Sequence, residues 1–182
     1  MPISEHAGKR DHRLSLCHRW GVILAGGDGK RLLPLTRRIA GDDRPKQFCC
    51  VFGNETLLHQ TRRRVAGIVP PHQILMVLTK AHEPFYADQV DELPADCLLI
   101  QSDNRGTAPA VLYSLMRMRS LDPNGLVAFF PSDHYFSDES ALHAHMDAAF
   151  REAECQPKRV ILLGMSPCQG LYQTWGRDHP SR

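Results

Sequence analysis

Short apolar runs alternate along the chain with segments that have helical spacing. Five runs are short and continuously apolar, as buried strands are: residues 20–25, 73–79, 97–100, 126–130 and 159–163. Four segments between or after them place apolar residues on one helical face: residues 56–68, 80–93, 107–119 and 137–154. Continuous apolar strands that alternate with helices are typical of parallel sheets. The pattern predicts an α/β protein with an open, doubly wound, mostly parallel sheet and helices on both faces.

The chain has 182 residues, which is enough for one core and too few for two typical domains. We expect a loose polar tail over residues 1–18, one folded domain over residues 19–166 and an irregular segment over residues 167–182. No apolar run approaches the ~20 residues of a membrane-spanning helix. The first twenty residues also lack the apolar stretch of a secretory signal.

Charge and cysteine content narrow the class of protein further. Twenty-two Lys and Arg residues against 20 Asp and Glu residues leave a net charge of +2, so no strong field indicates a nucleic acid or a membrane as the partner. The six cysteines form no C-x-x-C pair, and this spacing argues against a disulfide framework or a zinc site. We therefore expect reduced thiols and a cytoplasmic location.

Polar and glycine-rich segments follow three of the expected strands. They are residues 26–31, 102–109 and 131–134. In an open α/β sheet, ligands bind beyond the carboxyl ends of the strands. The sequence therefore predicts a site for phosphate, base or metal at that edge.

The first of these segments is a candidate phosphate loop. Gly26, Gly27 and Gly29 allow the backbone to approach an anion closely and to turn its N–H groups inward. Arg31 adds a planar set of donors for phosphate oxygens. A tight strand-to-helix turn is the alternative, and the loop sequence alone does not distinguish a phosphate-binding loop from such a turn.

Two common phosphate loops are excluded by spacing. The Walker pattern requires glycine where Leu24 stands and Ser or Thr where Arg31 stands. The dinucleotide fingerprint, begun at Gly27 and Gly29, requires Gly or Ala where Leu32 stands.

Lys46 and Asp133 are candidate charged groups of the same site. Pro45 stiffens the loop that carries Lys46, although a loop lysine is more often a solvated surface residue. Asp133 follows a very apolar strand and could hold Mg²⁺, for which carboxylate oxygens are suitable ligands. It could equally cap the next helix. For His134 we favour a structural hydrogen-bonding role.

Five motifs in order give a more specific indication. They are Leu24-Ala-Gly-Gly-x-Gly-x-Arg-Leu-x-Pro-Leu-Thr36, Arg44-Pro-Lys-Gln-Phe48, Thr56-Leu-Leu58, Asn104-Arg-Gly-Thr-Ala-Pro-Ala110 and Phe129-Phe-Pro-Ser-Asp-His134. This set resembles the mannose-1-phosphate guanylyltransferases, a branch of the sugar nucleotidyltransferase family. The resemblance covers residues 20 to 166 and implies the Rossmann-like fold of nucleotide-diphospho-sugar transferases, so the domain at 19–166 is expected to bind the nucleotide.

The resemblance also implies the reaction and the site. GMP would pass from GTP to mannose 1-phosphate, giving GDP-mannose and pyrophosphate, with Mg²⁺ as cofactor. Arg31 and Lys46 would be the catalytic residues, and Asp133 would bind the metal. The nucleotide would be bound by Leu24, Ala25, Gly26, Gly27, Gly29, Arg31, Lys46, Gly106, Thr107, Ala108, Pro109 and Asp133.

Two departures from the family pattern leave alternatives open. Lys30 stands where the family usually carries Thr or Ser, and the sequence after Pro167 no longer follows the family motif of the sugar site. We therefore expect a fold that is incomplete at its C-terminus, as a frameshift or early stop would produce. A non-catalytic nucleotide-binding remnant, and a transferase for another base or sugar, are the alternatives, and self-association is a further possibility.

Overall fold

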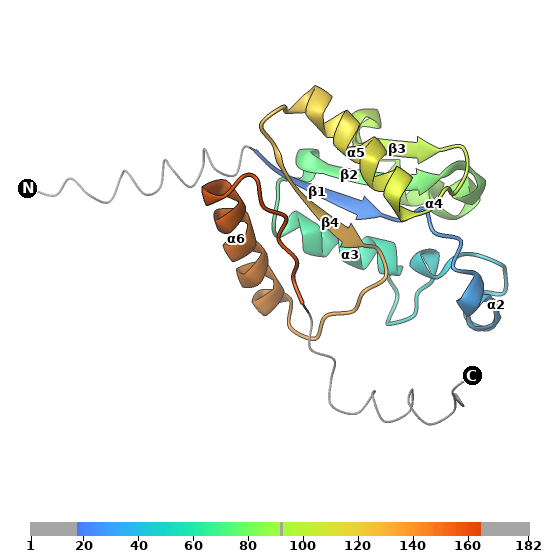
Figure 1. Cartoon of the computed structure of the whole chain (residues 1–182). Helices are drawn as coiled ribbons and strands as arrows, with labels where there is room; N and C mark the ends of the chain where they lie inside the picture. Colours follow the sequence, from blue (N-terminus) through green and yellow to red (C-terminus); the bar gives the residue numbers. More distant parts are fainter. Residues whose placement is uncertain (1–17, 92, 165–182) are drawn as a thin grey trace, which may run out of the picture.

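The protein folds around a four-stranded parallel sheet. The computed structural model describes residues 18–91 and 93–164 (Figure 1). The strands are β1 (Arg19–Leu24), β2 (Ile74–Thr79), β3 (Leu98–Gln101) and β4 (Leu126–Pro131), in the spatial order β3-β2-β1-β4. The predicted α/β class and parallel sheet are confirmed. Residues 1–17 of the tail expected at 1–18, and the irregular segment at 167–182, lie outside the described residues; His18 is described and its carbonyl accepts a hydrogen bond from the amide of Leu126 (2.7 Å).

The strand register brings the carboxyl ends together at one edge of the sheet. Leu24, the last residue of β1, lies opposite Val77 of β2 and Pro131 of β4. Thr79 and Gln101, the last residues of β2 and β3, lie opposite each other. The loops that follow β1, β3 and β4 therefore all leave the sheet at this edge.

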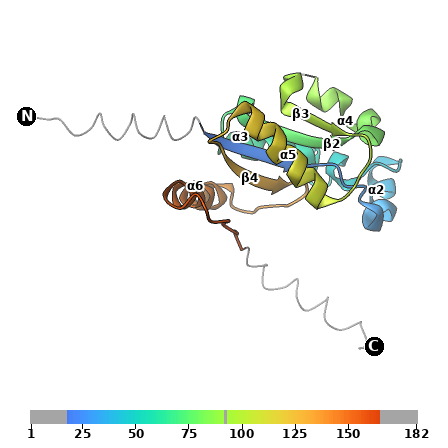
Figure 2. The same cartoon turned by 45° about the horizontal axis from the view of Figure 1, so that its top comes forward.

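Helices cover both faces of the sheet. One face packs against α3 (Leu57–Ala66), α4 (Glu83–Val90) and α6 (Glu139–Cys155), and the other packs against α5 (Thr107–Leu121). The two views show α5 crossing over the strands with its amino end near their arrowheads (Figure 1, Figure 2). Alternate residues of β2 face the two helix layers. Met76 packs in the core beneath α3, α4 and α6, and Leu75 packs in the core beneath α5.

Local caps define where the helices begin. The Thr56 hydroxyl accepts a hydrogen bond from the amide of His59 (3.1 Å) at the start of α3, as its N-cap position predicts. At the start of α6 the Asp138 carboxylate accepts one from the amide of Ala141 (2.8 Å). The cap of α6 is therefore Asp138, so capping does not account for Asp133.

Three elements differ from the sequence prediction. The apolar run at 159–163 is not a strand: Val160 and Leu162 are 89% and 86% exposed, and the described residues supply it with no neighbouring strand. A strand is stable only when its backbone groups are paired, so apolar character alone was insufficient. A short helix that was not predicted, α2 (Leu33–Ala40), follows the glycine loop and ends at Gly41.

The expected helix at 80–93 is shorter and begins with a 3₁₀ turn, η4 (Lys80–His82), followed by α4. None of the helices in the described part of the chain is long and apolar enough to cross a membrane.

Candidate functional site

The loop after β1 is held by side chains from two other elements. Gln47, in the 3₁₀ turn η2 (Lys46–Phe48), donates through Nε2 to the carbonyl oxygens of Ala25 (2.9 Å) and Gly27 (2.7 Å). Thr79, at the end of β2, donates through Oγ1 to the carbonyl oxygen of Gly26 (2.9 Å). Three consecutive carbonyl groups of the loop are therefore fixed in place.

Close approach explains two of the loop's glycines. A Cβ atom at Gly26 would lie 2.9 Å from Oγ1 of Thr79. Gly29 has a φ of 62°, and a Cβ there would lie 3.3 Å from the amide nitrogen of Lys46. At Gly27, by contrast, a Cβ would meet no atom within 4 Å, so packing does not demand glycine there.

Lys46 and Asp133 meet at this edge. The lysine Nζ and the Asp133 carboxylate form an ion pair, with the two side chains 33% and 18% exposed. Partial burial, and then the positive charge of Arg31, lower the pKa of Lys46, whereas a neighbouring carboxylate favours the charged amine. The structure thus brings Lys46, Asp133 and the charge of Arg31 into one electrostatic environment, although Arg31 itself is exposed.

A buried histidine supports the glycine loop from the other side. Nε2 of His82 lies 3.4 Å from Oδ1 of Asp28, and its ring contacts Phe48 edge to face. Burial lowers the pKa of His82, and the Asp28 carboxylate opposes that shift. Protonation of His82 is therefore disfavoured in the folded chain.

His134 lies next to Asp133 in a positive environment. Burial, then the charges of Lys46 and Arg64, lower its pKa. Arg64 also donates to the backbone oxygen of His134 (3.3 Å) and pairs with Glu139 (3.2 Å). The loop that carries Asp133 is thereby anchored to α3.

The donor set suits Mg²⁺ only in part. Asp133 supplies one carboxylate, and no group of three or more His, Cys, Asp or Glu side chains with metal-binding geometry occurs in the described residues. Magnesium sites that act on nucleotides commonly use one or two carboxylates and complete the shell with phosphate oxygens and water. Asp133 fits that shared arrangement, and the chain's described residues do not form a closed metal site.

The amino end of α5 is placed at the same edge but makes no direct link to these charges. Gly106, with a φ of 90°, precedes the helix, and its amide donates to the Asn104 side chain (3.0 Å). Residues 106–109 are exposed. Within residues 18–91 and 93–164, no hydrogen bond or ion pair joins them to Lys46, to Asp133 or to the glycine loop.

The two residues at the end of β1 contribute differently. Leu24 is half-buried, and Ala25 is fully buried. The Ala25 amide donates to the carbonyl of Val77 (2.9 Å), and its own carbonyl accepts from Gln47. Both backbone groups of Ala25 therefore take part in holding the loop.

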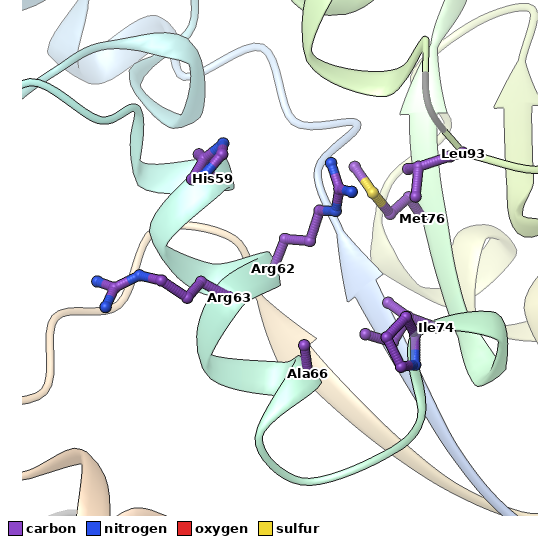
Figure 3. A pocket seen from close by; sticks show the side chains of 8 residues that line it. His59, Arg62, Arg63, Ala66, Ile74, Met76 and Leu93 are labelled. Carbon is purple, nitrogen blue, oxygen red and sulfur yellow. The ribbon is translucent and has the colours of Figure 1, made fainter.

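A hollow of about 230 Å³ lies elsewhere, between α3 and the start of β2. Figure 3 shows His59, Arg62 and Arg63 on the helix at one side of it, and Ile74 and Met76 at the other side. Arg62 donates to the Gln89 carbonyl (3.1 Å). None of the predicted site residues lines this hollow.

Gln47 and Thr79 are the site residues that sequence reasoning missed. Gln47 lies inside the Arg44–Phe48 motif, and a polar residue between Lys46 and the apolar Phe48 was the available signal. Both side chains are buried, 3% and 2% exposed, so their polar atoms require partners inside the protein. Which carbonyl groups they bind depends on the tertiary fold.

Comparisons with known proteins bear on the family and the fold of the chain. The sequence profile of the family described as "Nucleotidyl transferase" matches residues 20–163. The alginate biosynthesis protein AlgA of Pseudomonas aeruginosa is 34% identical over 148 residues, which are 79% of this chain and 29% of AlgA. The mannose-1-phosphate guanylyltransferase of Salmonella montevideo is 30% identical, over 80% of this chain and 30% of that protein.

A solved structure shows the same fold. The protein described as mannose-1-phosphate geranyltransferase from Thermus thermophilus superposes with a TM-score of 0.63 at 32% identity, covering 75% of this chain and 38% of its own. This chain thus spans about 30% of the length of the curated relatives named above. Because the family profile matches most of the chain, and the site is built where that fold places its ligands, the chain belongs to the nucleotidyl transferase family.

Proposed function

We propose that this chain provides the nucleotide-binding part of an enzyme that transfers GMP from GTP to mannose 1-phosphate. The observation that carries the proposal is the meeting of the glycine loop, Lys46 and Asp133 at the carboxyl ends of β1 and β4. The name of one relative, the mannose-1-phosphate guanylyltransferase of Salmonella montevideo, supports the choice of substrates.

The reaction is an in-line displacement at phosphorus. An oxygen of the sugar phosphate attacks the α-phosphorus of GTP, the bond from that phosphorus to the bridging oxygen breaks, and pyrophosphate leaves with the bonding electrons. No covalent protein nucleophile is required, so the protein acts by positioning and by neutralising charge. The backbone amides of Gly26, Gly27 and Gly29 would hold phosphate oxygens. Arg31 would stabilise the departing pyrophosphate.

Lys46 would neutralise the oxygens around the reacting phosphorus. Its ammonium group already lies beside a carboxylate at this edge, so a phosphate would bring further anionic partners to a preformed position. Asp133 would hold Mg²⁺ together with phosphate oxygens. When bound, that ion supplies charge neutralisation between the phosphates.

The amino end of α5 would receive the guanosine. Gly106, Thr107, Ala108 and Pro109 are exposed at the carboxyl-end edge and leave the backbone accessible to base and ribose. A cytoplasmic location accompanies this proposal, and the four free cysteines of the described residues are compatible with it.

A pyrophosphate-release assay tests the proposal. The purified chain is incubated with mannose 1-phosphate, Mg²⁺ and each nucleoside triphosphate in turn, and GTP binding is measured on the same sample by calorimetry. Release with GTP and mannose 1-phosphate supports the proposal. GTP binding without release indicates a nucleotide-binding module alone, and release with another base or sugar indicates a different transferase.

A further inference from the structure

We propose that Gln47 is a positioning residue that presets the glycine loop for the polyphosphate of the nucleotide. This inference rests on the proposed function and deepens it, because it concerns how the loop acquires its binding conformation. Gln47 touches neither the reacting atoms nor the ion pair of Lys46, and acts through the backbone.

The first argument is the direction of the loop's peptide groups. In a trans peptide the carbonyl of one residue and the amide of the next point in opposite directions. The carbonyl groups of Ala25 and Gly27 point at Gln47, so the N–H groups of Gly26 and Asp28 point away from it. The Gly26 carbonyl points at Thr79, which turns the N–H of Gly27 away from Thr79.

The second argument is that these N–H groups remain available. Among the described residues, the amides of residues 26–29 donate to no protein acceptor, whereas the amide of Ala25 immediately before them pairs with Val77 in the sheet. The backbone of residues 25–27 thus has its carbonyl groups bound, while the amides of residues 26–29 are unbound and can act as donors. Such an arrangement binds anions and would repel cations.

The third argument is that the Gln47 side chain is buried and that its single amide group binds both carbonyl groups. The Gln47 side chain is 3% exposed, and its amide group has two N–H donors, one for each carbonyl. Pro45 and Phe48 on either side are also buried, and Phe48 stacks on Phe85, so the turn that carries Gln47 is fixed. A side chain without donors would leave both carbonyl groups unsatisfied.

The fourth argument is the coupling to Lys46. Lys46 and Gln47 are consecutive in η2, and a Cβ at Gly29 would lie 3.3 Å from the Lys46 amide nitrogen. The two bonds of Gln47 therefore hold the glycine loop against the backbone that carries Lys46. A single side chain thus holds two parts of the proposed phosphate site, the glycine loop and the turn η2, in a fixed relative position.

A matched control is available on α3. Gln60 also donates through Nε2 to two loop carbonyl groups, those of Phe52 (2.9 Å) and Glu55 (3.1 Å), and none of these residues belongs to the candidate site. Gln47→Leu and Gln60→Leu remove the same number of hydrogen bonds of the same kind. Gln47 is buried and Gln60 only partly buried, so a purely structural role predicts a larger loss of stability in Gln47→Leu and, in both variants, a loss of ligand affinity no greater than the loss of stability explains.

The experiment measures binding of GTP and of inorganic tripolyphosphate by calorimetry, together with the melting temperature of each variant. We expect Gln47→Leu to weaken both ligands about tenfold, which corresponds to about 1.4 kcal/mol. Gln60→Leu should lower the melting temperature without a comparable effect on either ligand. Equal weakening by the two variants, or unchanged affinity in Gln47→Leu, would overturn the inference.

Two further measurements keep the test decisive. If Gln47→Leu fails to fold, Thr79→Val removes the third carbonyl contact in a nearly isosteric way, and Thr79→Ser, which keeps the hydroxyl, should restore binding. NMR order parameters of amides 26–29 test the inference without any ligand: we expect rigid values near 0.85 in the parent and a fall towards 0.6 in Gln47→Leu. Unchanged order parameters in Gln47→Leu would contradict the positioning role. Ordered amides in a parent chain that binds no polyphosphate would instead contradict the proposed function.

Discussion

Lys46 and Asp133 form an ion pair that joins the turn η2 to the end of β4, two segments that lie far apart in the sequence. Each group neutralises the other, so neither is a solitary charge in the ligand-free chain. In the proposed reaction, phosphate oxygens would share Lys46 and a magnesium ion would share Asp133. The pair is therefore the place where removal of one charge has the clearest consequence.

Asp133→Asn is expected to abolish the magnesium dependence of GTP binding. An amide has nearly the shape of the carboxylate and carries no charge for the cation. It also leaves Lys46 unpaired and free to bind phosphate, so binding without Mg²⁺ should be kept or improved. Calorimetric titrations with and without Mg²⁺ measure both effects, and we expect about a tenfold loss of the magnesium-dependent gain.

Asp88→Asn is the control, since Asp88 is an exposed carboxylate on α4 and is not the partner of Lys46. It should bind GTP as the parent does at every magnesium concentration. A normal magnesium response in Asp133→Asn would remove Asp133 from the site.

His82 predicts a pH dependence of stability. Burial lowers its pKa in the folded chain below the ordinary value of 6.5, so the unfolded chain binds the proton first as the pH falls. Stability is therefore lost as the pH falls below about 6.5 and stops falling, for this group, below the folded pKa. Thermal melts from about pH 7.5 to about pH 5.5 should show a smaller loss in His82→Gln than in the parent.

His134 has a pKa shifted in the same direction, so His82→Gln should retain part of the pH dependence. The exposed His145, on α6, provides the control variant His145→Gln. Parallel pH profiles for His82→Gln and the parent would show that the buried ring does not titrate in this range.

Arg19 predicts a stability effect far from the site. It is 3% exposed at the start of β1 and reaches two carboxylates of α6, Asp147 (2.6 Å) and Glu154 (2.8 Å). Arg19→Met would leave two acidic groups facing an apolar side chain. Both carboxylates are about a third exposed, which limits the loss to about 2 kcal/mol in a urea titration.

Arg63→Met provides the comparison for Arg19. Arg63 lies 3.6 Å from Glu55, and both side chains are well exposed. Exposed pairs contribute roughly 0–1 kcal/mol, so the variant should unfold close to the parent. Equal losses in the two variants would contradict the account of the β1–α6 link.

Much of the fold follows from the sequence because the central strands, β1 and β2, are buried on both faces and the edge strands, β3 and β4, are also apolar. The runs that became β1, β2, β3 and β4 are continuously apolar, and the polar residues after them mark the carboxyl ends. The run at 159–163 has the same character and no partner strand among the described residues, so periodicity alone could not distinguish it. Whether an apolar run pairs with a neighbouring strand depends on the tertiary fold.

The residues of the candidate site also fall into two groups, those that the sequence indicates and those that only the structure reveals. Gly29, Lys46 and Asp133 carry chemical signals that a sequence displays: a glycine repeat, a cation after proline and an acid after an apolar strand. Gln47 carries only a weak signal, its polar character beside Phe48, because its role depends on carbonyl groups some twenty positions earlier in the chain. A buried amide side chain is informative only once the backbone that it binds is known.

Gly29 and Gly41 separate backbone strain from disturbance of the site. Both have a positive φ, 62° and 79°, so alanine at either position should cost about 1–2 kcal/mol. At Gly29 the new Cβ would also lie 3.3 Å from the Lys46 amide nitrogen and displace η2, whereas at Gly41 it would meet nothing within 4 Å. We therefore expect similar losses of stability in urea, and a loss of GTP affinity of about fivefold only in Gly29→Ala. If Gly41→Ala weakened GTP equally, strain and not the contact with Lys46 would explain the effect.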